Sequence, residues 1–209
     1  MSGRAGLFVT LEGGEGAGKS TQARRLAAVF EAAGREVLLT REPGGTVGAE
    51  KVRGLLLDPE TELSALADTF LHFAARADHV EKVIAPAVAR GAVVICDRFY
   101  DSTLAYQGFG LGVRIETIVE FIKILDFKPD VSVFLELPDF IAKARLVGRG
   151  LAADRYDLMG EVFREKVAAG FRVIAASDPG RCVVVGAEGD TETVTAAIVA
   201  ALTARGFLA

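Results

Sequence analysis

Short apolar runs alternate along the chain with longer segments in which apolar residues recur at helical spacing. The short runs are almost continuously apolar, which is typical of strands covered on both faces. The predicted strands are Leu7–Leu11, Glu36–Thr40, Ala92–Cys96, Val131–Leu135 and Cys182–Val185. The predicted helices are Lys19–Ala33, Val47–Leu57, Leu63–Ala89, Ile115–Leu125, Asp139–Val147, Met159–Ala176 and Thr191–Arg205.

This alternation predicts βαβ units and therefore a three-layer α/β fold, in which a five-stranded parallel sheet is flanked by helices on both faces. No internal repeat and no shift in composition divides the 209 residues, so we expect a single domain spanning residues 1–209. In such sheets, ligands bind beyond the carboxyl ends of the strands. The chemistry is therefore expected just after each strand.

A glycine-rich segment follows the first strand and leads into a helix. Gly13, Gly18, Lys19 and Ser20 satisfy the spacing GxxxxGK[ST] of a phosphate-binding loop. The backbone amides and the helix N-terminus would hold ATP phosphates, with Lys19 on the β/γ-phosphates and Ser20 on Mg²⁺. The predicted ATP-binding residues of the loop are Gly13, Gly14, Glu15, Gly16, Ala17, Gly18, Lys19, Ser20 and Thr21.

Polar residues also follow the second and third strands. Asp97 ends the third strand, where a carboxylate can approach Mg²⁺, and the adjacent Arg98 could neutralise a second phosphate. A surface ion pair is the alternative interpretation of these two residues. After the second strand, Glu42-Pro43-Gly44-Gly45 predicts a rigid turn, in which we expect a cis Glu42–Pro43 bond.

The long predicted helix 63–89 carries polar residues on one face. His72, Arg76 and His79 share that face by their i, i+4 and i+7 positions. Arg76 interrupts a largely apolar helix, and a buried guanidinium needs a compensating anion, for which a phosphate would suffice. For His79 we favour a solvated or core-edge position.

Arginines and glycines gather between the fourth strand and the last long helices. Arg145 and Arg149 are i, i+4 neighbours, and a glycine-flanked segment then leads to Arg155. The pattern predicts a lid at about 146–158 that closes over a transferring phosphoryl group. A solvated basic face is the alternative.

The net charge and the number of cysteines limit which binding partners and which cellular compartment are expected. The 24 basic and 28 acidic residues give a net charge of −4, which argues against a nucleic-acid partner. Cys96 and Cys182 lie in apolar runs and are expected to be reduced core residues of a cytoplasmic protein. No apolar run reaches the ~18 residues needed to cross a membrane, so no membrane association is expected.

Taken together, the motifs resemble those of the bacterial thymidylate kinase family. The segments that carry the resemblance are Leu11–Thr21, Thr40–Thr46, Glu50–Asp58, Phe73–Val80, Cys96–Gly108 and Asp154–Asp157. The resemblance implies a P-loop nucleoside-monophosphate-kinase-like fold with a short lid. It also implies transfer of the γ-phosphoryl group of ATP to dTMP, giving dTDP and ADP for dTTP supply, with Mg²⁺ and in a homodimer.

The resemblance also implies roles for individual residues. The implied catalytic residues are Glu15, Lys19, Arg98, Arg149 and Arg155, and Arg145 joins the ATP-binding set. The implied dTMP-binding residues are Glu42, Pro43, Arg53, His72, Phe73, Arg76, Arg98, Thr103, Tyr106 and Gln107. Ser20 and Asp97 would hold Mg²⁺. Because Ala17 leaves the phosphate loop without an arginine, the lid would supply one.

Some positions depart from the family pattern. His72 stands where a base-stacking phenylalanine is usual and Phe73 follows it, so either ring could stack on thymine. Leu111 and Ala168 replace usual arginines. Two other functions remain as alternatives: a related nucleoside or nucleotide kinase with a different acceptor, and a non-catalytic nucleotide-dependent switch.

Overall fold

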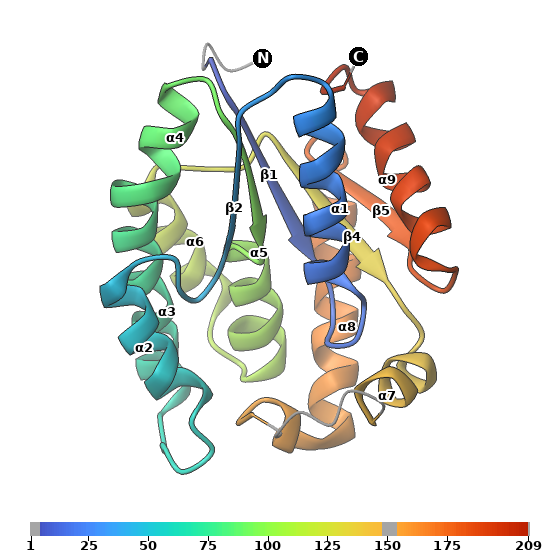
Figure 1. Cartoon of the computed structure of the whole chain (residues 1–209). Coiled ribbons are helices and arrows are strands. Elements are labelled where there is room, and N and C mark those ends of the chain that lie inside the picture. The colour runs from blue at the N-terminus through green and yellow to red at the C-terminus, as the bar shows by residue number, and fades with distance from the viewer. Residues whose placement is uncertain (1–4, 148–153, 209) are drawn as a thin grey trace.

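A parallel sheet of five strands forms the centre of the computed structural model, which describes residues 5–147 and 154–208 (Figure 1). Its strands are β1 (Leu7–Glu12), β2 (Val37–Arg41), β3 (Val93–Asp97), β4 (Val131–Glu136) and β5 (Cys182–Gly186). They are arranged in the order β2-β3-β1-β4-β5. Every predicted strand is present with bounds within one residue of the expected ones, because each is centred on a short, mostly apolar run.

Helices cover both faces of this sheet, as predicted. The α-helices are α1 (Lys19–Ala32), α2 (Val47–Leu57), α3 (Ala65–His79), α4 (Ala85–Ala89), α5 (Tyr100–Thr103), α6 (Ile115–Leu125), α7 (Asp139–Val147), α8 (Gly160–Ser177) and α9 (Thr191–Ala204). The other helical segments are η1 (Val80–Ile84), η2 (Leu104–Gly110) and η3 (Asp157–Met159). Helices α1 and α9 pack on one face, and α4, α6 and α8 pack on the other (Figure 1).

Alternate side chains of each strand supply two hydrophobic cores. Val9 and Leu11 of β1 pack with Phe30 of α1 and Ile198 of α9, whereas Phe8 points to the opposite face. All five side chains are buried. Burying a side chain of this size contributes about 1.5–3 kcal/mol, so the two cores fix the strands on which the polar loops are mounted.

Two helical segments differ from the prediction. The expected helix 63–89 is interrupted at Val80–Ile84 by π-helical turns. Pro86 follows closely; it lacks an N–H, and its ring would clash with the Lys82 carbonyl in a regular helix. The segment from Tyr100 to Gly110, for which no element was predicted, forms α5 and η2.

The strand register brings the polar loops to one edge of the sheet. Asp97, the last residue of β3, is level with Leu11 of β1 and with Arg41 of β2. Since all strands are parallel, the loops after β1, β2 and β3 emerge side by side. Among the described helices, none has the length and apolar character needed to cross a membrane.

Candidate active site

The loop after β1 presents an uncapped helix N-terminus. Gly18 adopts the left-handed conformation (φ 90°) that begins α1, and neither a side-chain cap nor an acidic residue in the first turn occupies the helix end. The Lys19 Nζ curls back to the Gly14 carbonyl oxygen at 2.7 Å. Burial, and secondarily the charge of Arg98, lower the pKa of Lys19. The loop can therefore bind an anion. Its backbone amides, the positive end of the helix dipole and the desolvated ammonium group of Lys19 all attract negative charge.

A hydroxyl and a carboxylate meet beside this loop. The Ser20 Oγ donates a hydrogen bond to the Asp97 Oδ2 at 2.5 Å, which joins the start of α1 to the end of β3. Oxygen donors of this kind suit Mg²⁺, which also takes ligands from phosphate. The predicted metal-ligating pair is therefore chemically suited to the ion.

Arg98 lies at the centre of the polar network. Its backbone is left-handed (φ 75°), which is uncommon for a residue other than glycine. The guanidinium donates to the Gly13 carbonyl at 3.0 Å and the Tyr106 hydroxyl at 3.1 Å, and it forms an ion pair with Glu15. The charge of Arg98 outweighs the effect of burial and lowers the pKa of Glu15 to about 2, so Glu15 is ionised at neutral pH.

The turn after β2 delivers a buried carboxylate. The Glu42–Pro43 bond is cis, as expected. Glu42 accepts from Arg76 Nε at 2.6 Å and lies 3.1 Å from His79 Nδ1. The counter-ion of Arg76 is therefore Glu42, and no substrate phosphate is needed to compensate its charge. The expected solvated or core-edge position of His79 is wrong: the ring is fully buried because Thr40 and Glu42 engage both of its nitrogens.

Arg53 is bound differently from the other pocket arginines. Its Nη1 donates to the Pro43 carbonyl at 2.8 Å, and within the described residues no carboxylate lies within 4.0 Å of its guanidinium. Burial, followed by the charge of Arg41, lowers the pKa of Arg53. Its positive charge is thus directed to the pocket without a counter-ion.

His72 and Phe73 point in different directions. His72 lines the pocket, and its Nε2 lies 2.9 Å from the Tyr156 hydroxyl. Burial, and then the charge of Arg76, lower the pKa of His72 to about 3, so the imidazole is neutral. Phe73 instead packs against Phe121 with ring centroids 5.1 Å apart, away from the pocket.

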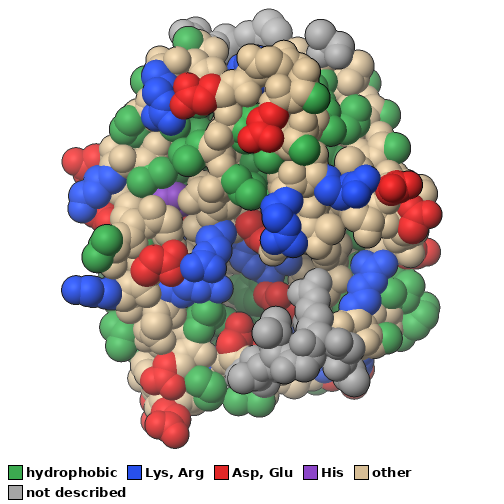
Figure 2. All heavy atoms as spheres, in the orientation of Figure 1, with side chains coloured by type: hydrophobic (Ala, Val, Ile, Leu, Met, Phe, Trp, Pro, Cys, Tyr) green, Lys and Arg blue, Asp and Glu red, His purple; other side chains and the backbone are tan. Residues whose placement is uncertain are grey.

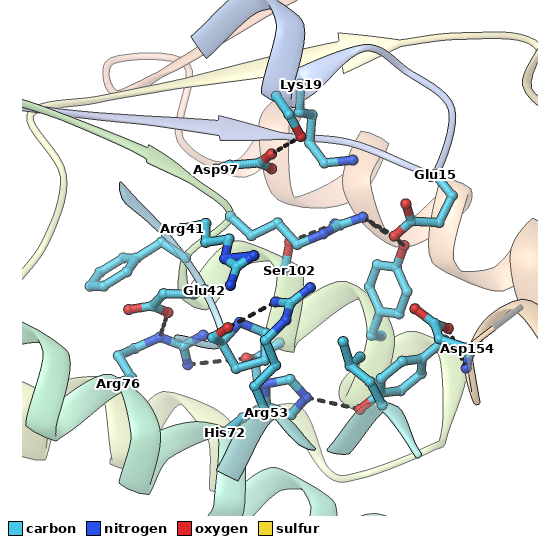
Figure 3. Close-up of a pocket in the computed structure, with 18 of the residues that line it drawn as sticks. Glu15, Lys19, Arg41, Glu42, Arg53, His72, Arg76, Asp97, Ser102 and Asp154 are labelled. Atoms are coloured by element: carbon cyan, nitrogen blue, oxygen red, sulfur yellow. Dashed lines mark hydrogen bonds and ion pairs between the residues drawn. The ribbon is translucent and has the colours of Figure 1, made fainter. Parts of the chain in front are cut away.

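These groups surround one pocket of about 230 Å³. Figure 2 shows it as a hollow rimmed by charged side chains. In the close-up, Lys19 and Asp97 lie at one end, and Arg53, Arg76 and His72 lie at the other (Figure 3). The predicted site residues that line it are Glu15, Gly16, Gly18, Lys19, Ser20, Glu42, Pro43, Arg53, His72, Arg76, Asp97, Arg98, Thr103, Tyr106 and Gln107.

Other predicted residues lie elsewhere. Gly13, Gly14 and Ala17 line a second, more apolar cavity of about 590 Å³ between β4 and α8, while Thr21 lines neither cavity. Arg145 donates to the Ala187 carbonyl at 3.0 Å. Arg149 lies outside the described residues, as does the rest of the 148–153 segment of the predicted lid.

The pocket also contains residues that the prediction missed. Arg41, Ser102, Asp154 and Tyr156 line it. Arg41 belongs to the segment Thr40–Thr46, Ser102 to Cys96–Gly108, and Asp154 and Tyr156 to Asp154–Asp157, so the segments that carry the family resemblance contained all four. The sequence did not show that Ser102 faces the pocket, because α5, the helix that carries it, was not predicted.

Comparisons with known proteins agree with this geometry. The thymidylate kinase family profile matches residues 11–198. The thymidylate kinase of Gluconobacter oxydans is 52% identical over 206 residues, covering 97% of this chain and 96% of that protein. That of Caulobacter vibrioides is 47% identical, with 92% and 94% covered. The crystal structure of thymidylate kinase from Ehrlichia chaffeensis superposes with a TM-score of 0.76 at 33% identity, covering 94% of this chain and 98% of that chain.

Proposed function

The chain belongs to the thymidylate kinase family and transfers the γ-phosphoryl group of ATP to dTMP, and from this premise we propose how its pocket performs the transfer. The observation that carries the proposal is the position of two anion-binding groups in one pocket. The phosphate loop with Lys19 forms one end, and Arg53, which has no ion-paired carboxylate in the described part of the chain, forms the other. Alignment and charge neutralisation are the main requirements of phosphoryl transfer.

The donor end binds ATP. The free amides of α1 and the glycine loop hold the β- and γ-phosphates, and Lys19 exchanges its bond to the Gly14 carbonyl for a phosphate oxygen. Ser20 and Asp97 would hold Mg²⁺, which supplies charge neutralisation on the phosphates when bound. Arg145 and Thr21 complete the proposed ATP-binding set from beyond the pocket.

The acceptor end binds dTMP. Arg53 and Arg98 hold the dTMP phosphate, since both guanidinium groups face the pocket. Arg76 contributes through Glu42 and Thr103, to which it is hydrogen-bonded. Glu15, held by Arg98, approaches the acceptor sugar and phosphate.

The base and sugar lie against the uncharged part of the wall. His72, Thr103 and Gln107 surround thymine, and the Tyr106 ring occupies the space that a 2′-hydroxyl would need. His72 is the ring assigned to the base, because Phe73 packs toward Phe121. The imidazole of His72 is neutral, which suits a position beside thymine, because the base carries no charge.

A lid arginine completes the charge neutralisation. Because Ala17 offers no guanidinium, we assign this role to the segment at about 146–158, with Arg149 and Arg155 as candidates. Arg155 forms an ion pair with Asp68 and could reach ATP only by leaving it. Arg149 is therefore the simpler assignment.

Assembly and location follow from the same premise. We propose a homodimer, since α3 and α6 leave Leu66, Phe70 and Ile124 exposed. We also propose that the protein acts in the cytoplasm, where DNA precursors are made. Its two free, buried cysteines suit that reducing compartment.

The test is an acceptor panel. Steady-state kcat/KM is measured with ATP, Mg²⁺ and each of dTMP, dUMP, dCMP, dGMP and UMP, with ADP release as the readout. We expect dTMP to exceed dCMP, dGMP and UMP by at least about 100-fold, because a pocket built on hydrogen bonds strongly rejects mismatched partners. Preference for another monophosphate would favour the kinase with a different acceptor, and nucleotide binding without transfer would favour the switch.

A further inference from the structure

Asp68 of α3 is a fully buried carboxylate behind the base end of the pocket. Burying a charge is costly unless partners compensate it. Three residues distant in sequence do so: Arg155 forms an ion pair with it, the Tyr156 hydroxyl lies 2.9 Å from its Oδ2, and the Gln107 Nε2 lies 2.8 Å from its Oδ1. Asp68 itself does not line the pocket, but Gln107 and Tyr156 do.

The carboxylate fixes which way the Gln107 amide faces. An ionised carboxylate accepts hydrogen bonds and cannot donate them, so only the NH₂ group of Gln107 can face Asp68. The Nε2 also lies 3.2 Å from the Tyr156 hydroxyl, which accounts for its second hydrogen. The amide donors are therefore used inside the protein, and the Oε1 acceptor is left for a ligand in the pocket.

The same carboxylate fixes the tautomer of His72. The Tyr156 hydroxyl has one hydrogen, and its position 2.9 and 3.1 Å from the two Asp68 oxygens directs that hydrogen to the carboxylate. The hydroxyl is then only an acceptor for its other neighbours, which are Arg155 Nη2 at 3.1 Å, the Gln107 amide at 3.2 Å and His72 Nε2 at 2.9 Å, and this places the ring proton on Nε2. Because burial lowers the pKa of His72 to about 3, the ring carries no second proton and Nδ1 is an acceptor.

We propose that Asp68 is a positioning residue that determines base specificity by turning the donors of Gln107 and Tyr156 inward and leaving acceptors toward the base. Thymine presents a donor at N3–H, whereas cytosine presents a lone pair at N3. Hydrogen-bond acceptors in the pocket wall pair with the N3–H of thymine and repel the N3 lone pair of cytosine. Binding cytosine would also leave buried polar groups unpaired, which is costly. The inference rests on the proposed function, because it explains how the dTMP site rejects a cytosine nucleotide.

Asp68→Asn is the primary test. The asparagine has nearly the same shape but can donate as well as accept, so the Gln107 amide is no longer held in one orientation. We expect the ratio of kcat/KM for dTMP to that for dCMP to fall about 10-fold to 100-fold, the range expected for one reversed hydrogen bond. The loss for dTMP should lie mainly in KM, since the base is remote from the reacting phosphate. The ratio of dTMP to dUMP should not change, because both bases carry N3–H.

Two further variants separate positioning from general damage. Asp78→Asn is the matched control: Asp78 is also an α3 carboxylate, bonded to Thr46 and Lys82, and its replacement should leave all ratios unchanged. Asp68→Glu keeps a group that only accepts, so it should retain the dTMP preference even if its melting temperature falls. Should Asp68→Asn fail to fold around an unpaired Arg155, Asp68→Asn with Arg155→Met removes that charge and should show the same loss of discrimination.

The outcomes distinguish this inference from the proposed function. If the wild-type enzyme shows no preference for dTMP, the proposed function fails before any variant is considered. If the wild type prefers dTMP and the folded Asp68→Asn enzyme, alone or with Arg155→Met, keeps the wild-type ratio of dTMP to dCMP, the positioning role of Asp68 is overturned.

Discussion

At the scale of single residues, Glu12 shows how a buried acid that does not line the pocket can support Arg98, which does. Its Oε1 accepts from the Phe99 backbone N–H at 2.8 Å, and its Oε2 accepts from the Ser102 hydroxyl at 2.6 Å. Ser102 in turn accepts from Arg98 at 3.0 Å. Glu12 thus holds the turn that follows Arg98, whose left-handed backbone needs such support.

The protonation of Glu12 gives a pH prediction. Burial, followed by the charge of Asp101, raises the pKa of Glu12 to about 8, from 4.5 in the unfolded chain. Between these values the folded state binds more protons than the unfolded state, so this contribution to stability is complete below pH 4.5 and is lost as pH rises through 8. The loss has a slope of up to about 1.4 kcal/mol per pH unit.

Glu12→Gln should remove this dependence, because glutamine resembles the protonated acid and does not titrate. We expect the free energy of unfolding of the variant, relative to wild type, to rise by about 1–3 kcal/mol between pH 5.5 and 7.5. Urea unfolding at both pH values measures it. His72 has a lowered pKa and acts in the opposite direction, but it is present in both proteins and cancels in the difference. A difference that is constant with pH would contradict the prediction.

At the scale of elements, the phosphate loop depends on how closely it approaches β4. Gly13 has φ 133°, and a Cβ there would lie 2.5 Å from the Leu135 carbonyl oxygen. Gly14, the next residue, has an ordinary φ, and a Cβ on it would meet no atom within 4 Å. The two adjacent glycines therefore form a matched pair.

Gly13→Ala should destabilise the protein far more than Gly14→Ala. Backbone strain and the clash with β4 should together cost about 2–5 kcal/mol, which lowers the melting temperature by roughly 4–15 °C in a protein of this size. Gly14→Ala should change it by less than about 3 °C. Calorimetry without nucleotide is the appropriate measurement, since both glycines belong to the proposed ATP-binding loop. Equal melting temperatures would show that the loop can move away from β4 at little cost.

At the scale of the whole molecule, assembly is the property to test. Ile124 of α6 is 78% exposed, and Phe70 of α3 is 51% exposed while packing against Phe121 at 5.1 Å. Neighbouring apolar side chains on two helices form the kind of surface that a partner chain covers.

Ile124→Glu should weaken the proposed homodimer. Placing a carboxylate in an apolar interface should raise the dissociation constant at least about 10-fold, as measured by sedimentation equilibrium. Val162→Glu on α8 is the control, since Val162 is similarly exposed (66%) on another helix, and it should leave the association unchanged. A monomeric wild-type protein at micromolar concentration would refute the dimer itself, and an intact dimer in Ile124→Glu would exclude α6 from its interface.

Sequence alone determined the five strands, most of the helices and most of the pocket, because the apolar runs, helical spacing and loop motifs are local signals. Gly18, Lys19 and Asp97 could be placed from the residues beside them. The tertiary structure decided what burial and packing control: that Glu42 neutralises Arg76, that His72 rather than Phe73 faces the pocket, and that Asp68 engages Arg155. The two ion pairs join residues 34 and 87 positions apart. The residues next to each partner in sequence do not predict these contacts. Burying a charge is costly without a partner, and which partner is available depends on how the folded chain brings distant residues together.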